Sequence, residues 1–103
     1  MKSILLLSAL ALWLPGGTAF AQDDEFYKTK NCVACHRVDR NSLGPSFNNV
    51  AAKYAGTPGA DVMLAKKIRE GGAGVWGPSP MPPQAQVSED ESLTLARWIL
   101  QLK

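Results

Sequence analysis

The order of hydrophobic and polar residues predicts several short helices joined by glycine- and proline-rich loops. In the middle of the chain, residues 46–54 carry apolar side chains at helical spacing. These side chains are Phe47, Val50, Ala51 and Tyr54. A second helix is expected to begin at Thr57 and Pro58, because proline is well tolerated at the first helical position, and to end at Gly71. Its predicted buried face comprises Val62, Ala65 and Ile68.

An earlier helix is expected just before the cysteines. Asp23 and Asp24 offer an N-cap and a negative first turn, both of which favour a helix start. The aromatic residues Phe26 and Tyr27 follow, and we interpret them as packing groups. A loop over residues 37–45 then leads to the central helices.

The last third of the chain combines a proline-rich loop with a helix that has a clear start. Residues 71–83 hold a density of proline that neither a helix nor a central strand tolerates, so this segment is predicted to be a stiff loop. Ser88 and Glu91 then form the sequence pattern of a capping box. The predicted apolar face of this helix comprises Leu93, Ala96, Ile99 and Leu100, widened by Leu95, Trp98 and Leu102. No strand pattern is visible, which predicts an all-α fold.

The beginning of the chain is typical of a secretory signal peptide. Lys2 precedes an apolar run over residues 4–14, and Ala19 and Ala21 place small residues where cleavage requires them. The run is shorter than the roughly 20 residues of a membrane span, so we expect cleavage after Ala21 and no stable membrane insertion. The predicted parts are therefore a signal peptide over residues 1–21 and one domain over residues 22–103.

Length and charge narrow the function further. A chain of 103 residues allows one small domain and excludes a two-domain enzyme. Its formal net charge is +2, and removal of the signal peptide takes away Lys2 and no acidic residue, so nucleic-acid binding is not supported. A domain of this size buries a limited core and often depends on a disulfide, a metal or a cofactor.

The only two cysteines and the only histidine lie together as Cys32, Cys35 and His36. This is the C-x-x-C-H pattern of covalent haem attachment. Two thiols at this spacing on a helical turn can each reach one vinyl group of the same porphyrin. The adjacent His36 is then carried under the iron as the proximal ligand.

Three other interpretations of this motif fit the chain less well. A structural zinc needs four ligands, and the chain supplies three cysteine or histidine ligands. A thioredoxin-like dithiol follows a strand in an α/β pattern, which is not found here. A disulfide between Cys32 and Cys35 would close a very small loop and stabilise little.

The sixth iron ligand has one strong candidate. The absence of a second histidine excludes a bis-histidine site, which leaves Met63 and Met81 after the signal peptide. Met81 lies between Pro80 and Pro82 in the stiff loop, and methionine beside histidine is a known cytochrome c pairing. Met63 falls inside a predicted helix, where methionine more often fills the core. The alternative for Met81 is simple loop packing.

Several stretches together resemble a known family. Residues 32–36, Gly44 with Pro45, residues 50–56 and residues 74–83 are similar to those of small bacterial class I c-type cytochromes of the cytochrome c-551 (c8) kind. The similarity spans essentially the whole region after the signal peptide. It implies a class I cytochrome c fold, with four to five short helices wrapped around one haem c that is bound covalently through its two cysteines.

The resemblance also implies roles for single residues. Pro45 matches the proline whose carbonyl accepts a hydrogen bond from the proximal histidine. Trp76 matches the tryptophan whose indole N–H reaches a haem propionate, and Lys67 falls where the family often has an arginine beside that propionate. Gln84 falls where the family can have an asparagine that hydrogen-bonds to the region around the methionine. The stretch over residues 84–87 is one residue longer than in typical members of the family. Asn31 stands where glycine is common.

The function that follows is a soluble periplasmic one-electron carrier and not an enzyme, with His36 and Met81 as iron ligands. The resemblance implies donation to a nitrite reductase, a peroxidase or a terminal oxidase, after reduction by a membrane quinol-oxidising complex. We expect a monomer that docks transiently through apolar residues near the haem edge, around Val33, Ala34 and Pro82. The alternatives are a haem-based ligand sensor or weak peroxidase with an open sixth coordination site, and a dithiol redox module.

Overall fold

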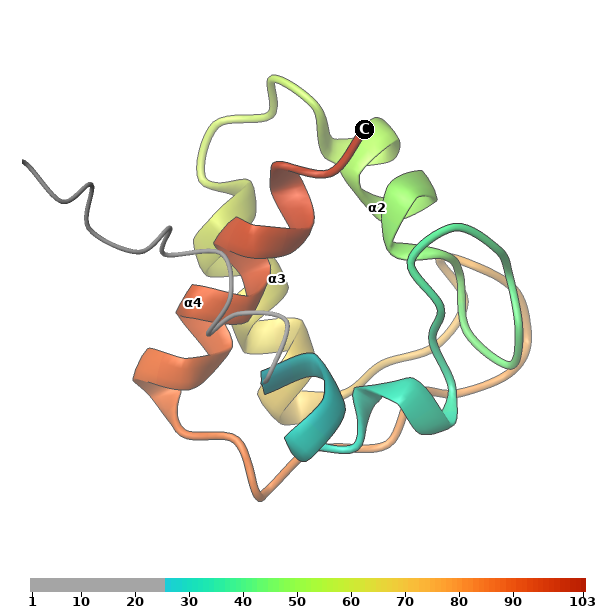
Figure 1. Ribbon diagram of the computed structural model, residues 1–103, viewed down its shortest axis with the longest axis vertical. Coiled ribbons are helices and arrows are strands. Elements are labelled where there is room, and N and C mark those ends of the chain that lie inside the picture. The colour runs from blue at the N-terminus through green and yellow to red at the C-terminus, as the bar shows by residue number, and fades with distance from the viewer. Residues whose placement is uncertain (1–25) are drawn as a thin grey trace, which may run out of the picture.

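The computed structural model describes residues 26–103, which fold into short helices joined by long loops (Figure 1). The elements are a 3₁₀ helix η1 (Cys32–Ala34) and the α-helices α2 (Phe47–Tyr54), α3 (Ala60–Glu70) and α4 (Glu89–Leu100). Residues 26–29 are also helical, and no strand occurs among the described residues. The all-α prediction is confirmed. The predicted signal peptide and the predicted helix start at Asp23 or Asp24 lie outside the described residues.

Two of the predicted helix starts are confirmed by their caps. The hydroxyl of Ser46 accepts a hydrogen bond from the Asn49 N–H at 3.1 Å, which opens α2. At α4 the Ser88 hydroxyl accepts from the Glu91 N–H at 3.1 Å, while the Glu91 carboxylate accepts from the Ser88 N–H at 3.0 Å. This is the complete capping box, which satisfies two backbone donors that the helix itself leaves unpaired.

Helix α3 starts later than its sequence pattern predicts. It begins at Ala60 instead of at Thr57 and Pro58, because Gly59 adopts a left-handed conformation with φ 73° that a right-handed helix cannot include. The Ala60 N–H donates to the Thr57 carbonyl at 3.3 Å, so the residues before Ala60 form a turn. The predicted end is confirmed, since Gly71 caps the helix with φ 72°.

The buried face of α3 also differs from the prediction. Val62 is 63% exposed, whereas Ala60, Leu64, Ala65 and Ile68 are buried. Residues two positions apart on a helix point to nearly opposite sides, so the burial of Leu64 turns Val62 toward solvent. The prediction that Val62 lies on the buried face is therefore wrong.

The core forms where α4 packs against α3 and α2. Leu95 and Ala96 of α4 are 1% and 0% exposed, so Leu95 lies at the centre of the core and not at its margin as predicted. Leu93 and Leu100 are only partly buried. An aromatic cluster closes one end, where the Tyr27 ring lies 5.3 Å from that of Phe47 and 5.7 Å from that of Trp98. Such contacts contribute to stability beyond the area they bury.

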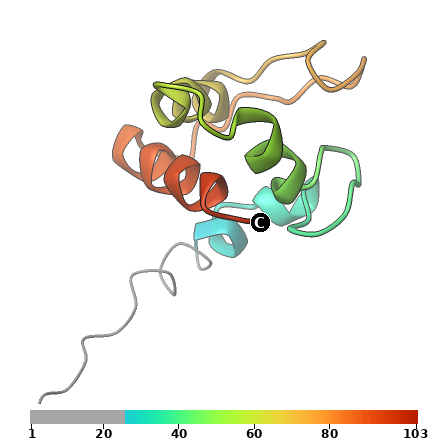
Figure 2. The ribbon, with the colours of Figure 1, turned by 90° about the horizontal axis from the view of Figure 1, so that it is seen from above.

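Two long loops complete the molecule. Figures 1 and 2 show the segments over residues 37–46 and 71–83 on the same side of the molecule, away from α4. The second of them is proline-rich and contains a single pair of bridged residues, Gly72 and Met81. Among residues 26–103, no helix has the length and apolar character needed to cross a membrane.

Candidate haem site

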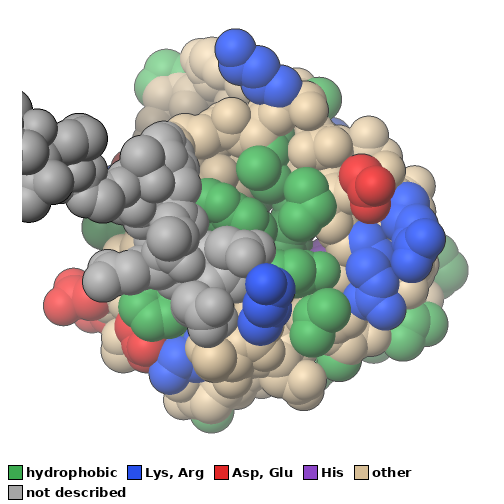
Figure 3. All heavy atoms as spheres, viewed as in Figure 1, with side chains coloured by type: hydrophobic (Ala, Val, Ile, Leu, Met, Phe, Trp, Pro, Cys, Tyr) green, Lys and Arg blue, Asp and Glu red, His purple; other side chains and the backbone are tan. Residues whose placement is uncertain are grey.

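A cavity of about 540 Å³ lies between α2, α3, α4 and the two long loops. Its volume falls within the range of about 300–1,000 Å³ typical of small-molecule and cofactor sites. The seven residues predicted for the site all line it: Cys32, Cys35, His36, Pro45, Lys67, Trp76 and Met81. Hydrophobic side chains gather around a hollow in the middle of the face shown in Figure 3. The fold therefore brings together residues that are up to 49 positions apart, from Cys32 to Met81.

The attachment motif lies on a tight helical turn. Within η1 and the residue after it, the N–H groups of Cys35 and His36 donate to the Cys32 carbonyl at 3.2 and 2.9 Å. This turn directs both free thiols and the imidazole to the same cavity. Asn31 starts the turn in the left-handed conformation, with φ 67°, which a glycine would adopt without a Cβ penalty.

The thiol of Cys32 is partly buried beside the cavity. Burial raises its pKa above the ordinary value, and a backbone hydrogen bond only partly opposes this effect. Reactive thiols of dithiol oxidoreductases have a lowered pKa, because the thiolate is the attacking species. The environment of Cys32 therefore disfavours the dithiol module.

In residues 26–103 there is no cluster of three or more Cys, His, Asp or Glu side chains that could hold a metal ion.

His36 is held in one orientation by its neighbours. Its Nδ1 lies 2.8 Å from the Pro45 carbonyl oxygen, which is the contact expected of Pro45. A carbonyl can only accept, so Nδ1 carries the proton and Nε2 keeps the lone pair that a metal requires. The ring also stacks on Phe47, with centroids 4.9 Å apart. A Cβ at Gly44 would lie 2.5 Å from Cε1 of the imidazole, so only glycine fits beside the ring.

Met81 is fixed by backbone pairing on the opposite loop. The Met81 N–H donates to the Gly72 carbonyl at 2.7 Å, and the Gly72 N–H donates to the Met81 carbonyl at 3.0 Å. A Cβ at Gly71 would lie 2.3 Å from the Met81 carbonyl oxygen, so this glycine permits the close approach. Met63 does not line the cavity and is 38% exposed on α3. Of the two candidate thioethers, the fold brings that of Met81 to the cavity.

Lys67 of α3 and Trp76 of the proline-rich loop lie on the cavity wall, as their expected roles require. The structure adds Lys53, whose Nζ lies 5.5 Å from the ring centroid of Trp76 in a cation–π contact. Sequence reasoning missed this residue, because nothing in the spacing of Lys53 and Trp76 indicates that they meet.

Two other contacts support the attachment turn. The Tyr27 hydroxyl donates to the His36 carbonyl at 2.8 Å. The Arg37 guanidinium donates to the His36 carbonyl at 3.0 Å and also to the Val33 carbonyl. The sequence pattern predicts only a packing role for Tyr27, but a buried tyrosine usually finds a hydrogen-bond partner for its hydroxyl, and this rule indicates the polar role.

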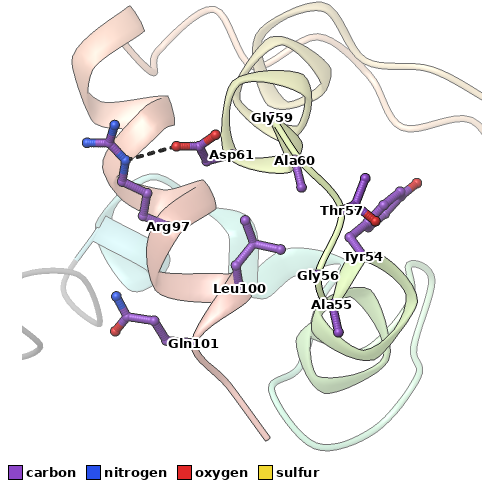
Figure 4. A pocket seen from close by; sticks show the side chains of 10 residues that line it. All are labelled: Tyr54, Ala55, Gly56, Thr57, Gly59, Ala60, Asp61, Arg97, Leu100 and Gln101. Carbon is purple, nitrogen blue, oxygen red and sulfur yellow. Dashed lines mark hydrogen bonds and ion pairs between the residues drawn. The ribbon is translucent and has the colours of Figure 1, made fainter.

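A second hollow lies outside this site, between the α2–α3 connection and the end of α4 (Figure 4). The ion pair between Asp61 and Arg97, with 3.2 Å between carboxylate and Nε, crosses its edge. None of the ten side chains drawn there belongs to Cys, His or Met, so this hollow offers no thiol, imidazole or thioether ligand.

The donor set of the large cavity fits a covalently attached haem. It offers two thiols on one turn, an imidazole whose Nε2 is left free, and a thioether on the facing loop. Apolar side chains provide most of the remaining wall that a porphyrin needs. These include Phe47, Val50, Leu64, Ile68, Leu95 and Ile99.

Fold and site together define a class I c-type cytochrome. The family model for cytochrome c matches residues 24–103, and the chain belongs to this family. It is 51% identical to cytochrome c-551 of Pseudomonas aeruginosa and 45% identical to cytochrome c-552 of Hydrogenobacter thermophilus, and each alignment covers 100% of both chains. The crystal structure of Nitrosomonas europaea cytochrome c552 superimposes with a TM-score of 0.76 at 46% identity, over 78% of this chain and 99% of that chain.

These findings confirm the predicted fold class and cofactor. The protein is a small monohaem cytochrome with haem c attached through Cys32 and Cys35, and relatives of this kind carry electrons.

Proposed function

We propose that this chain is an exported, periplasmic one-electron carrier in which His36 and Met81 would hold the haem iron. The observation that carries the proposal is that both side chains line the same cavity as the two cysteines. The haem supplies an iron that accepts and releases one electron. The protein supplies ligands that stay in place.

The residues around His36 oppose its movement. The Pro45 carbonyl orients the imidazole through Nδ1, and a hydrogen bond of this kind also strengthens the donor character of Nε2. Phe47 and the Cα of Gly44 hold the ring from its sides. Because these groups belong to the folded backbone or the core, we expect the same ligand orientation in both oxidation states, which keeps the reorganisation on electron transfer small.

Met81 is restrained in a comparable way. Its two backbone hydrogen bonds to Gly72 fix the residue at the end of α3, and Pro80 and Pro82 limit the backbone on either side. Little conformational entropy is left to lose when the thioether binds. A restrained sixth ligand favours electron transfer over binding of small molecules.

The partner is expected to dock near the attachment turn. Val33 is 36% exposed and Ala34 and Pro82 are also exposed, which provides the small apolar patch for a transient contact. Arg37, whose guanidinium donates to the Val33 carbonyl, supplies positive charge at its margin. We propose a monomer that donates to a nitrite reductase, a peroxidase or a terminal oxidase, and that a membrane quinol-oxidising complex reduces. Export depends on the proposed signal peptide over residues 1–21, with residues 22–103 as the cytochrome domain.

Carbon monoxide tests the electron-carrier assignment against a ligand sensor or weak peroxidase. We expect the reduced holoprotein to keep its spectrum under carbon monoxide, and to pass reversibly between two redox states in a voltammetric scan. Tight carbon monoxide binding by the reduced protein at neutral pH would contradict the proposal and favour an open sixth site.

A further inference from the structure

Gln86 connects the loop that carries Met81 to the segment just before the attachment motif. Its side-chain Nε2 donates to the backbone carbonyl of Lys30 at 2.9 Å, although the two residues are 56 positions apart in the chain. In return, Nζ of Lys30 lies 3.4 Å from the Gln86 carbonyl oxygen. Lys30 is two residues before Cys32, so the contact joins the methionine loop to the start of the attachment turn.

The same amide continues toward Met81. The Gln86 Nε2 also donates to Oε1 of Gln84 at 2.6 Å, and the Gln84 Nε2 donates to the Pro82 carbonyl at 2.9 Å. An amide nitrogen carries two hydrogens, so Gln86 can make both of its bonds at once. Its bond to Oε1 sets the direction of the Gln84 amide, which then points its own N–H at the residue that follows Met81. Hydrogen bonds that are linked in series in this way polarise and strengthen one another.

The chain of hydrogen bonds supports the segment that directly follows Met81. At Met81 itself the loop is paired with Gly72 through both the N–H and the carbonyl of Met81. After Met81 the backbone is next held where the Gln84 N–H donates to the Ile68 carbonyl at 3.2 Å. The side chains of Gln84 and Gln86 bridge this stretch and anchor it to the opposite edge of the site.

Lys30 itself is fixed by a further contact. Its Nζ lies 2.9 Å from Oε2 of Glu91, and the other oxygen of this carboxylate accepts from the Ser88 N–H. The acceptor of the Gln86 amide therefore belongs to a segment that is tied to the first turn of α4. An anchored acceptor makes the Gln86 contact more effective than a contact with a free chain segment.

We propose that Gln86 is a positioning residue for Met81, which holds the methionine loop against Lys30 and so opposes displacement of the thioether from the iron. The inference rests on the proposed ligation by Met81. Loss of one such hydrogen bond corresponds to about a two- to tenfold change in the equilibrium between a closed and an opened loop. An added ligand that competes for the iron should report this change directly.

The experiment is an imidazole titration of the oxidised holoprotein, followed by its visible spectrum. We expect Gln86→Ala to bind imidazole about two- to tenfold more tightly than the wild type. The matched control is Gln101→Ala, which removes another exposed glutamine at the end of α4, outside the cavity wall. We expect the control to bind imidazole as the wild type does.

Hydrogen exchange separates positioning from general loss of stability. In Gln86→Ala we expect faster exchange of the Met81 N–H, with unchanged exchange of the Ala96 N–H in the core of α4. Equal acceleration at both positions, or an imidazole affinity equal to that of the wild type, would overturn the role of Gln86. A wild-type spectrum without the band of sulfur ligation would instead overturn the proposed Met81 ligand, so the two failures are distinguishable.

Discussion

The imidazole Nδ1 of His36 lies 2.8 Å from the carbonyl oxygen of Pro45, and the Cα of Gly44 lies against the same ring. Two consecutive residues of one loop thus set the tautomer of the His36 imidazole and restrict the position of its ring. The loop can do so because the Gly44 N–H donates to the Cys35 carbonyl at 2.8 Å, which binds it to the attachment turn. The chemistry of His36 therefore depends on a backbone arrangement with no room for a side chain.

Gly44→Ala tests this dependence. The added Cβ would lie 2.5 Å from Cε1 of His36, so the ring or the loop must shift. Overpacking of this kind destabilises proteins by about 1–3 kcal/mol. We expect a loss of that size in urea unfolding of the holoprotein, together with a changed visible spectrum. Gly56→Ala is the control, because Gly56 has φ 72° and open space around it, so strain there should lower stability and leave the spectrum unchanged. An unchanged spectrum in Gly44→Ala would contradict the account.

Asn31 provides a test of backbone strain at the attachment turn. It is the one residue other than glycine with positive φ in residues 26–103, at 67°. A residue with a Cβ in this conformation costs about 1–2 kcal/mol, and asparagine tolerates it better than alanine does. We expect Asn31→Ala to lower the free energy of unfolding by about 1 kcal/mol, and Asn31→Gly to equal or exceed the wild type. Greater stability of the alanine variant than of the glycine variant would be the contradictory result.

The lowered pKa of Glu91 predicts part of the pH dependence of the protein's stability. The hydrogen bond from the Ser88 N–H, and then the contact with Lys30, hold the pKa of this carboxyl below its ordinary value of 4.5. Because the pKa of Glu91 is lower in the folded state, the ionised carboxylate stabilises the fold at pH values above the unfolded-state pKa. This stabilisation is lost as the pH falls through the folded-state pKa. We expect the melting temperature of the wild type to exceed that of Glu91→Gln at pH 7, and the difference to shrink below about pH 4.5. A difference that stays constant down to pH 3 would rule out this role.

The cofactor is expected to form part of the core. The chain is short, and several core side chains, among them Phe47, Leu64 and Leu95, also line the cavity. Small domains of this kind often fold only with their metal or cofactor. We expect the double variant Cys32→Ala/Cys35→Ala, prepared without haem, to be largely unfolded by circular dichroism. A compact apoprotein that melts cooperatively would show that the polypeptide core suffices.

Local chemistry determined which elements could be predicted from the sequence. The start of α4 follows from Ser88 and Glu91, because a cap depends on residues within one helical turn. The attachment turn and the thioether loop were predictable for the same reason: a motif of adjacent residues carries the chemistry. These features can be predicted without knowing which other parts of the chain pack against them.

Features that depend on distant contacts could not be predicted in the same way. The exposure of Val62 and the central place of Leu95 are set by how α3 lies on α4, which the periodicity of either helix alone does not determine. The contact of Gln86 with Lys30 joins residues 56 positions apart and has no sequence pattern. The cation–π contact of Lys53 with Trp76 likewise appears only once the loop is folded over α2.

The measurement that tests the central claim most directly is the visible spectrum of the oxidised holoprotein in three forms: wild type, Met81→Ala and Met63→Ala. Met81 lines the cavity and Met63 does not, so the two substitutions remove equivalent thioethers from different places. We predict that the absorption band of sulfur–iron ligation is present in the wild type and in Met63→Ala and is lost in Met81→Ala, with a lowered reduction potential. A band that survives in Met81→Ala, or that disappears in Met63→Ala alone, would contradict the account.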